Sequence, residues 1–174
     1  MGYTVIRSHE ICAGHRVVGH ESKCRHLHGH NYKFHFKVAP KHGCGKVVTR
    51  GKLVEDGLDN VGRVIDFSVV KTTLCQWLED NWDHKFLHWE HDSVINSLIV
   101  VASTEFAREN NLVKDEDYDP FVNSLVALPF NPTAENLAAY MVDVIGPQLL
   151  DQYGVELVEC TIEETSKCHV NYCK

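Results

Sequence analysis

The 174-residue sequence lacks several features that mark large classes of protein. No apolar run approaches the roughly 18 residues of a membrane-spanning helix, so we expect no membrane partner. Basic residues are not in excess, because the formal net charge is −7. Nucleic-acid-binding domains are usually basic, and we therefore expect no nucleic-acid partner. The start of the chain, Met1-Gly2-Tyr3-Thr4, also lacks the basic and apolar pattern of a signal peptide.

Paired cysteines are missing as well. The sequence has seven cysteines, an odd number, and no two of them form a C-x-x-C pair. A disulfide framework normally uses an even number of cysteines in a secreted protein. We therefore expect a reduced, cytoplasmic protein.

Histidine, in contrast, is abundant, with 12 residues. His28 and His30 begin a run in which alternate positions are apolar, from Tyr32 to Val38. Side chains alternate between the two faces of a strand, so both imidazoles are predicted to lie on the apolar face. His15 ends the preceding apolar segment, and a neighbouring strand can bring it alongside. Three histidines with an open fourth position are typical of catalytic zinc, so we predict a Zn²⁺ site; the alternative is a set of hydrogen-bonded histidines without metal.

Cys24 lies four residues before the first of these paired histidines, in a polar stretch. A nearby Zn²⁺ lowers the pKa of a thiol and favours the thiolate, which acts as a base or nucleophile. Two alternatives remain from the residues alone. Cys24 is either a fourth zinc ligand, which would make the site structural, or an ordinary buried cysteine.

Three further positions carry candidate chemistry. Asp83 precedes His84, and a carboxylate can orient an imidazole for acid–base catalysis, although a solvated loop explains a bare Asp-His equally well. Glu164 continues the row of Val158, Cys160 and Ile162 in a predicted final strand, whereas Glu159 and Glu163 are predicted to face solvent. A carboxylate ending an apolar row needs a partner, such as the N–H groups of a pterin or guanine, unless the strand end is simply exposed to water.

The remaining pattern favours an α+β fold with a mainly antiparallel sheet. Strands are predicted over 3–15, 28–38, 124–128, 155–164 and 168–173. One helix is predicted from a Ser68 cap to about Asn81, and another from Thr133, with Pro147 kinking or restarting it. Thr133 and Glu135 are explained as a helix cap and a first-turn acid. Residues 40–60 and 92–123 are predicted to be enlarged connections of a single domain spanning 1–174, the first a long loop or added hairpin. Within the second, 93–107 is predicted to contain a helix, with or without a strand before it, and 110–119 a surface loop.

Six motifs in order resemble the 6-pyruvoyl-tetrahydropterin synthase / 6-carboxy-5,6,7,8-tetrahydropterin synthase family. They are Ala13-Gly14-His15, Cys24-x3-His28-Gly29-His30-Asn31-Tyr32, Val64-Ile65-Asp66-Phe67, Asp83-His84-Lys85-Phe86-Leu87, Asn131-Pro132-Thr133-Ala134-Glu135-Asn136-Leu137-Ala138 and Glu164-Thr165. One departure stands at the first metal-ligand motif, where the family usually has alanine and this chain has Gly14.

The resemblance implies the tunnelling fold, which is a four-stranded antiparallel sheet with two helices on one face. Subunits of this fold form β-barrels, and we expect a homohexamer built as a dimer of trimers, with active sites between subunits. The resemblance also implies site roles: zinc ligands His15, His28 and His30; catalytic Cys24, Asp83 and His84; and substrate-binding Glu164, Thr133 and Glu135.

The Cys-x3-His spacing resembles the carboxy-type branch of the family. We therefore expect a carbon–carbon lyase that converts 7,8-dihydroneopterin triphosphate to 6-carboxy-5,6,7,8-tetrahydropterin in 7-deazaguanine (preQ0/queuosine-type) synthesis. One alternative is a pyruvoyl-type synthase, which eliminates triphosphate from the same substrate. The other is a non-catalytic zinc protein with Cys24 as the fourth ligand. Lys23, Arg25 and Lys85 are placed to meet the triphosphate.

Overall fold

The computed structural model describes residues 2–41, 47–49, 52–54 and 57–174, with side chains described in 2–41 and 57–174. Its internal contacts group into two compact units. The first unit comprises Met1–Ile11, Asn31–Asp80 and Ala134–Lys174, and the second comprises Cys12–His30 and Asn81–Thr133. The expectation of a single domain over 1–174 stays a prediction.

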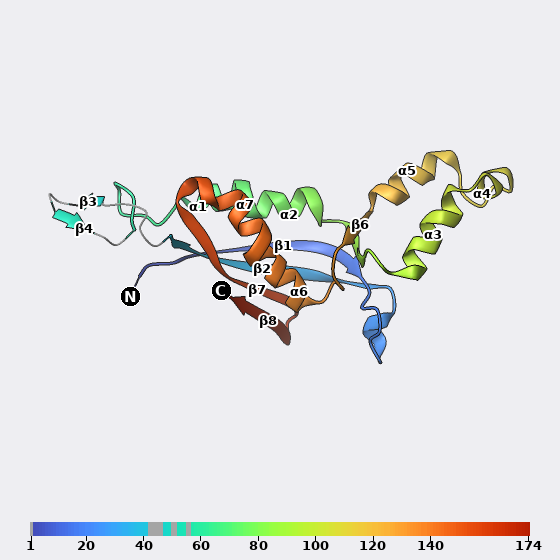
Figure 1. Ribbon diagram of the computed structural model, residues 1–174, viewed down its shortest axis with the longest axis horizontal. Coiled ribbons are helices and arrows are strands. Elements are labelled where there is room, and N and C mark those ends of the chain that lie inside the picture. Colours follow the sequence, from blue (N-terminus) through green and yellow to red (C-terminus); the bar gives the residue numbers. More distant parts are fainter. Residues whose placement is uncertain (1, 42–46, 50–51, 55–56) are drawn as a thin grey trace. The chain divides into compact units, whose positions relative to one another are not determined.

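The described residues form strands and mostly short helices (Figure 1). The strands are β1 (Val5–His15), β2 (His28–Pro40), β3 (Val47–Thr49), β4 (Lys52–Val54), β5 (Lys85–Trp89), β6 (Leu125–Leu128), β7 (Val155–Thr165) and β8 (Cys168–Cys173). The α-helices are α1 (Phe67–Val70), α2 (Gln76–Asn81), α3 (Ser93–Ser103), α4 (Glu105–Glu109), α5 (Asp115–Asn123), α6 (Ala134–Tyr140) and α7 (Gly146–Leu150). Shorter helical turns are η1 (Lys23–Arg25), η2 (Lys71–Cys75), η3 (Met141–Ile145) and η4 (Asp151–Tyr153).

The main sheet has six strands in the order β6-β5-β1-β2-β7-β8. Four of the five strands predicted from the sequence, β1, β2, β7 and β8, are adjacent in it, and the pairs β2–β7 and β7–β8 are antiparallel. The fifth, predicted over 124–128, is present as β6. The observed sheet is nevertheless larger than the expected four-stranded, mainly antiparallel one. Two short strands extend it with parallel pairings, β1 with β5 and β5 with β6. Strand β5 was not predicted, because a run of five residues gives little period-2 signal of its own and its pairing depends on tertiary contacts.

Two long helical segments cover one face of the strands in the first unit (Figure 1). One runs through α1, η2 and α2, and the other through α6, η3 and α7; each has a π-helical turn in its middle. The buried row of β2, which is Tyr32, Phe34, Phe36 and Val38, has no exposed surface. Burial of such side chains contributes about 1.5–3 kcal/mol each, so this row anchors the sheet under the helices.

The helix ends refine the sequence predictions. Asp66, and not Ser68, caps the first segment, because its side chain accepts a hydrogen bond from the Ser68 N–H at 2.8 Å. That segment ends at Asn81, as predicted. Pro147 lies in the first turn of α7, so the helix restarts there after η3. The proline lacks an N–H and is tolerated at such a start.

Strand β7 contains one residue more than its partner between Lys37 and Val38. This bulge shifts the buried row to Leu157, Cys160 and Ile162, while Val158 is only half-buried. The predicted row through Val158 is therefore wrong at that residue. Glu164 lies at a second irregularity, between Glu163 and Thr165, where β7 pairs with β8, and is half-buried.

In the second unit, the expected connection over 92–123 forms the helices α3, α4 and α5. Asp92 caps α3 through hydrogen bonds from the N–H groups of Val94 and Ile95. The predicted surface loop over 110–119 is wrong in its second half, because α5 begins at Asp115. Three acidic residues in its first turn face the positive end of the helix dipole, which explains why a very polar stretch is helical. Within the described residues, no helix has both the length and the hydropathy to cross a membrane.

The other expected connection, at about 40–60, falls partly on positions outside the described residues. Its described backbone includes β3 and β4, which pair antiparallel with Val47 opposite Val54. The added hairpin that the sequence left open is therefore present.

Candidate metal centre

Three histidines from two strands meet in the second unit. His15 ends β1, and His28 and His30 begin β2. The ring centroids lie 4.4 Å apart for His15 and His28, 5.2 Å for His15 and His30, and 5.1 Å for His28 and His30. Each ring offers a nitrogen within 4.8 Å of those of the other two. Because a zinc–nitrogen bond is about 2.0–2.1 Å, this spacing suits three ligands around one ion.

Hydrogen bonds fix how two of these rings present their nitrogens. Nδ1 of His15 lies 2.7 Å from the Pro132 carbonyl oxygen, and Nδ1 of His28 lies 2.8 Å from that of His26. A carbonyl oxygen only accepts, so each Nδ1 carries the proton and donates it. The Nε2 lone pair of each ring is then directed away for a metal, an outer-shell arrangement common among zinc-binding histidines.

The surroundings of His15 also keep its ring in the neutral form. His15 is only 2 % exposed, and burial lowers the pKa of His15 to about 4; the Pro132 carbonyl opposes this shift, and the nearby His28 and His30 add to it. His15 is therefore neutral at physiological pH, which is the form that binds metal. The donor set fits Zn²⁺, with His15, His28 and His30 as the ligands.

Two glycines let the strands approach closely beside these ligands. A Cβ on Gly29 would lie 2.9 Å from the backbone oxygen of Ala13. A Cβ on Gly14 would lie 2.7 Å from Cδ2 of Phe86, which accounts for glycine where the family resemblance leads us to expect alanine. The absent side chains thus allow β1 to pack closely against β2 at Gly29 and against β5 at Gly14, where His15 is held.

Cys24 lies in η1, half-buried, in the loop that joins His15 to His28. Its carbonyl oxygen accepts a hydrogen bond from the Val17 N–H at 2.8 Å. Among the residues with described side chains, the group of potential metal ligands contains the three histidines and not Cys24. The geometry therefore corresponds to a three-histidine site with the thiol on a neighbouring loop.

Asp83 and His84 are paired in space as well as in sequence. Nδ1 of His84 lies 2.7 Å from Oδ2 of Asp83, while Oδ1 of Asp83 accepts a 2.8 Å hydrogen bond from the Cys12 N–H. Partial burial raises the pKa of the Asp83 carboxyl, but the hydrogen bonds from Cys12 and His84 outweigh it and hold that pKa below its usual range. The carboxylate therefore stays charged and orients the imidazole, which is 80 % exposed and available to a substrate.

The remaining predicted residues divide between the two units. Thr133, in the second unit, immediately precedes α6, and Glu135, in the first, lies exposed in the first turn of that helix. Glu164, also in the first unit, is half-buried near the end of β7. Lys85 donates a hydrogen bond to the Asn123 carbonyl oxygen at 2.7 Å. Each substrate-binding role stays a prediction.

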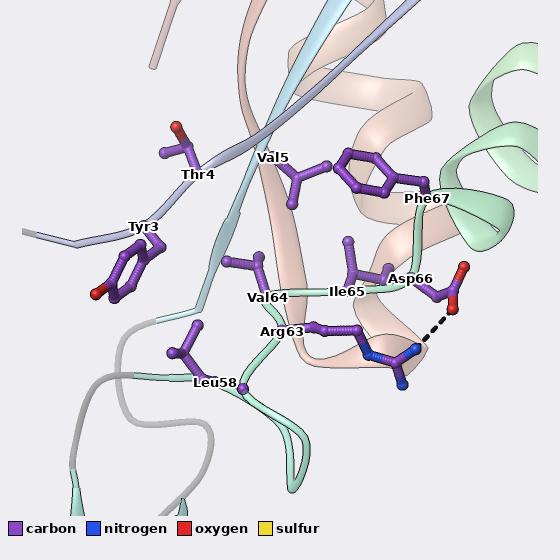
Figure 2. Close-up of a pocket in the computed structure, with 10 residues that line it drawn as sticks. Tyr3, Thr4, Val5, Leu58, Arg63, Val64, Ile65, Asp66 and Phe67 are labelled. Carbon is purple, nitrogen blue, oxygen red and sulfur yellow. Dashed lines mark hydrogen bonds and ion pairs between the residues drawn. The ribbon is translucent and has the colours of Figure 1, made fainter.

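A hollow of about 240 Å³ in the first unit contains none of the predicted site residues (Figure 2). Its wall combines the start of the chain, including Tyr3 and Val5, with the loop before α1. Arg63 bonds to both Asp59 and Asp66 and so shapes this loop. The motif Val64-Ile65-Asp66-Phe67 supplies part of the wall of this hollow.

The fold and the histidine cluster together define an α+β protein of the tetrahydropterin synthase class. The family model described as 6-pyruvoyl tetrahydropterin synthase matches residues 4–174. The chain belongs to this family.

Curated relatives and solved structures agree with that assignment. A 6-carboxy-5,6,7,8-tetrahydropterin synthase of Rickettsia bellii is 29 % identical over 161 residues, covering 92 % of this chain and 93 % of the relative. The enzyme of that name from Haemophilus influenzae is 26 % identical over 130 residues, covering 73 % of this chain and 70 % of its own. An uncharacterised Wolinella succinogenes protein matches with a TM-score of 0.73 at 21 % identity over 99 % of this chain and 98 % of its own. The Plasmodium vivax 6-pyruvoyl tetrahydropterin synthase has a TM-score of 0.57 at 16 % identity, covering 99 % and 97 %.

Proposed function

We propose that this chain is a zinc-dependent 6-carboxy-5,6,7,8-tetrahydropterin synthase. Its substrate is 7,8-dihydroneopterin triphosphate, and its product serves 7-deazaguanine synthesis. The observation that carries the proposal is the cluster of His15, His28 and His30, with Cys24 on the adjoining loop. The Rickettsia relative of the same name supports it, because the alignment spans more than nine-tenths of both chains.

The residues supply distinct parts of the chemistry. When bound, Zn²⁺ acts as a Lewis acid that stabilises negative charge on substrate oxygens. Cys24, as a thiolate, accepts a proton from the substrate side chain. His84, oriented by Asp83 at 2.7 Å, transfers a proton at a second position. Glu164 accepts hydrogen bonds from the pterin ring and fixes which carbons face the two groups, and Thr133 and Glu135 border the pocket.

A pyruvoyl-type synthase is the second candidate. It acts on the same substrate but eliminates triphosphate without losing carbon, and the name of the matching family model favours it. A non-catalytic zinc protein with Cys24 as fourth ligand is the third, and it is disfavoured because Cys24 stands outside the cluster of ligand nitrogens.

The test is a reaction of the purified, zinc-loaded chain with 7,8-dihydroneopterin triphosphate, followed by mass spectrometry of the pterin products. The carboxy product is expected from the wild type and not from the chelated protein. The pyruvoyl product would assign the chain to the other branch, and no turnover with full zinc would favour the non-catalytic protein. We also propose that active sites lie between subunits of a homohexamer, which the mass measured by light scattering tests.

A further inference from the structure

The loop after His15 is fastened to two residues far along the sequence, all within the second unit. Nε of Arg16 lies 3.2 Å from Oδ2 of Asp92, a carboxylate that is 1 % exposed. The side chain of Asn131 forms hydrogen bonds with both backbone groups of Val18. Its Oδ1 accepts from the Val18 N–H at 2.9 Å, and its Nδ2 donates to the Val18 carbonyl oxygen at 2.7 Å. One side-chain amide thus satisfies both backbone groups of a single loop residue.

The residue next to Val18 is hydrogen-bonded to the backbone of Cys24. Val17, the neighbour of Val18, donates its N–H to the carbonyl oxygen of Cys24 at 2.8 Å. The residue after Asn131, Pro132, receives the 2.7 Å hydrogen bond from the His15 ring. Two consecutive residues therefore hold the first metal ligand and the loop that carries Cys24.

The two hydrogen bonds to Val18 require a side chain that both donates and accepts, as an amide does. A carboxylate cannot donate to a carbonyl, an ammonium cannot accept from an N–H, and an alkyl side chain does neither. Asn131 is also held on its own side, because its carbonyl oxygen accepts from the Thr133 N–H at 2.7 Å. The side chain is half-buried, and its amide is occupied by Val18 and not directed at solvent.

We propose that Asn131 is a positioning residue that sets the place of the Cys24 thiol relative to the metal centre. The inference rests on the proposed function of Cys24 as the base. Displacing a catalytic group by about 1 Å can cost about 100-fold in rate. We therefore expect Asn131→Ala to lower kcat at least about tenfold, with KM changed less than about twofold, because the loss is one of orientation rather than of substrate contacts.

The experiment compares Asn131→Ala and Asn131→Asp with a matched control, Asn96→Ala. Asn96 also donates its side-chain N–H to a backbone carbonyl, that of Glu90, at 2.8 Å, but it lies on α3 and not on the loop. Measurements on the zinc-loaded proteins are zinc content, kcat and KM, hydrogen exchange of the Val18 amide, and alkylation of Cys24 followed by mass spectrometry of its peptide.

Asn131→Ala should keep zinc, because Pro132 holds His15 through a backbone carbonyl. It should speed exchange at Val18 and alkylate Cys24 at least about threefold faster, since the half-buried thiol is released. Asn131→Asp retains the acceptor for the Val18 N–H and loses the donor, so it should protect that amide yet still lose kcat. If Asn131→Ala does not fold, this second variant alone decides, and a wild-type kcat in it overturns the proposal.

Two other outcomes also overturn it: wild-type kcat and alkylation rate in Asn131→Ala, or losses in Asn96→Ala of the same size. The proposed function fails differently. If the wild type itself turns over no pterin, the reaction assigned to the chain is wrong. The Val18 exchange and Cys24 alkylation rates would still test whether the hydrogen bonds of Asn131 hold the loop in place.

Discussion

Acidification of the metal-free protein is expected to remove stability that His15 provides at neutral pH. The pKa of His15 falls from its ordinary 6.5 to about 4 on folding, chiefly because the ring is buried. Between these two values the unfolded chain takes up a proton that the folded chain does not. The contribution of His15 is therefore complete above about pH 6.5 and is lost as the pH falls toward 4.

The size of the effect follows from the same two values. At about 1.4 kcal/mol per pH unit, lowering the pKa from 6.5 to about 4 amounts to about 3 kcal/mol in the free energy of unfolding. This is a large share of the roughly 5–15 kcal/mol that stabilises a typical domain. The loss should be spread over the interval, with a slope no steeper than about 1.4 kcal/mol per pH unit from this one group.

The assay is urea unfolding of chelator-treated protein at steps from pH 7.5 to pH 4. The matched control is His15→Gln, whose side chain can still donate to the Pro132 carbonyl but has no proton to gain. The wild type should lose about 3 kcal/mol more than the control over this range. Parallel curves for the two proteins would refute the inference that His15 is buried in its neutral form.

Four further substitutions test the site. His28→Ala and His30→Ala should each deplete zinc in metal analysis, because removing one of three ligands leaves the ion with two; full occupancy in both would contradict the ligand set. Cys24→Ala should retain zinc and fold but lose turnover, and joint loss of metal and activity would instead identify the thiol as a ligand. Glu164→Gln should weaken pterin binding in calorimetry by roughly 10- to 150-fold, the value of a charge-assisted hydrogen bond of about 1.5–3 kcal/mol. Glu163→Gln should not, since that side chain bonds to His35 across the outer face of the sheet.

Residues with a strong periodic pattern were predictable from the sequence. The alternation from His28 to Val38 correctly placed two imidazoles on the row that becomes fully buried at Tyr32. His15 could be added because an apolar segment ended there, and both expected long helices formed. In each case the local pattern and the tertiary packing demand the same arrangement.

Features that depend on a partner strand or on helix-end chemistry were not predictable. The bulge in β7 moves Val158 out of the buried row. The apolar pair Leu157-Val158 interrupts the alternation there, but only the pairing with β2 shows which of the two residues is buried. Strand β5 is set by its pairing with β1, opposite Ala13 and His15, rather than by its own five residues. The Asp83–His84 contact was one of several arrangements that adjacency allowed, and the structure shows it together with a left-handed backbone conformation at His84.

Because of that conformation, selection for folding stability and selection for activity are expected to favour different residues at position 84. His84 has a φ of 54°, a left-handed backbone that costs a non-glycine residue of order 1–3 kcal/mol and glycine very little. A library at position 84 scored for cellular abundance should therefore favour glycine, whereas the same library scored for growth dependent on the pterin product should retain histidine. The separation between the two scores at this position would measure how much folding stability is lost in favour of the proton-transfer role proposed for His84.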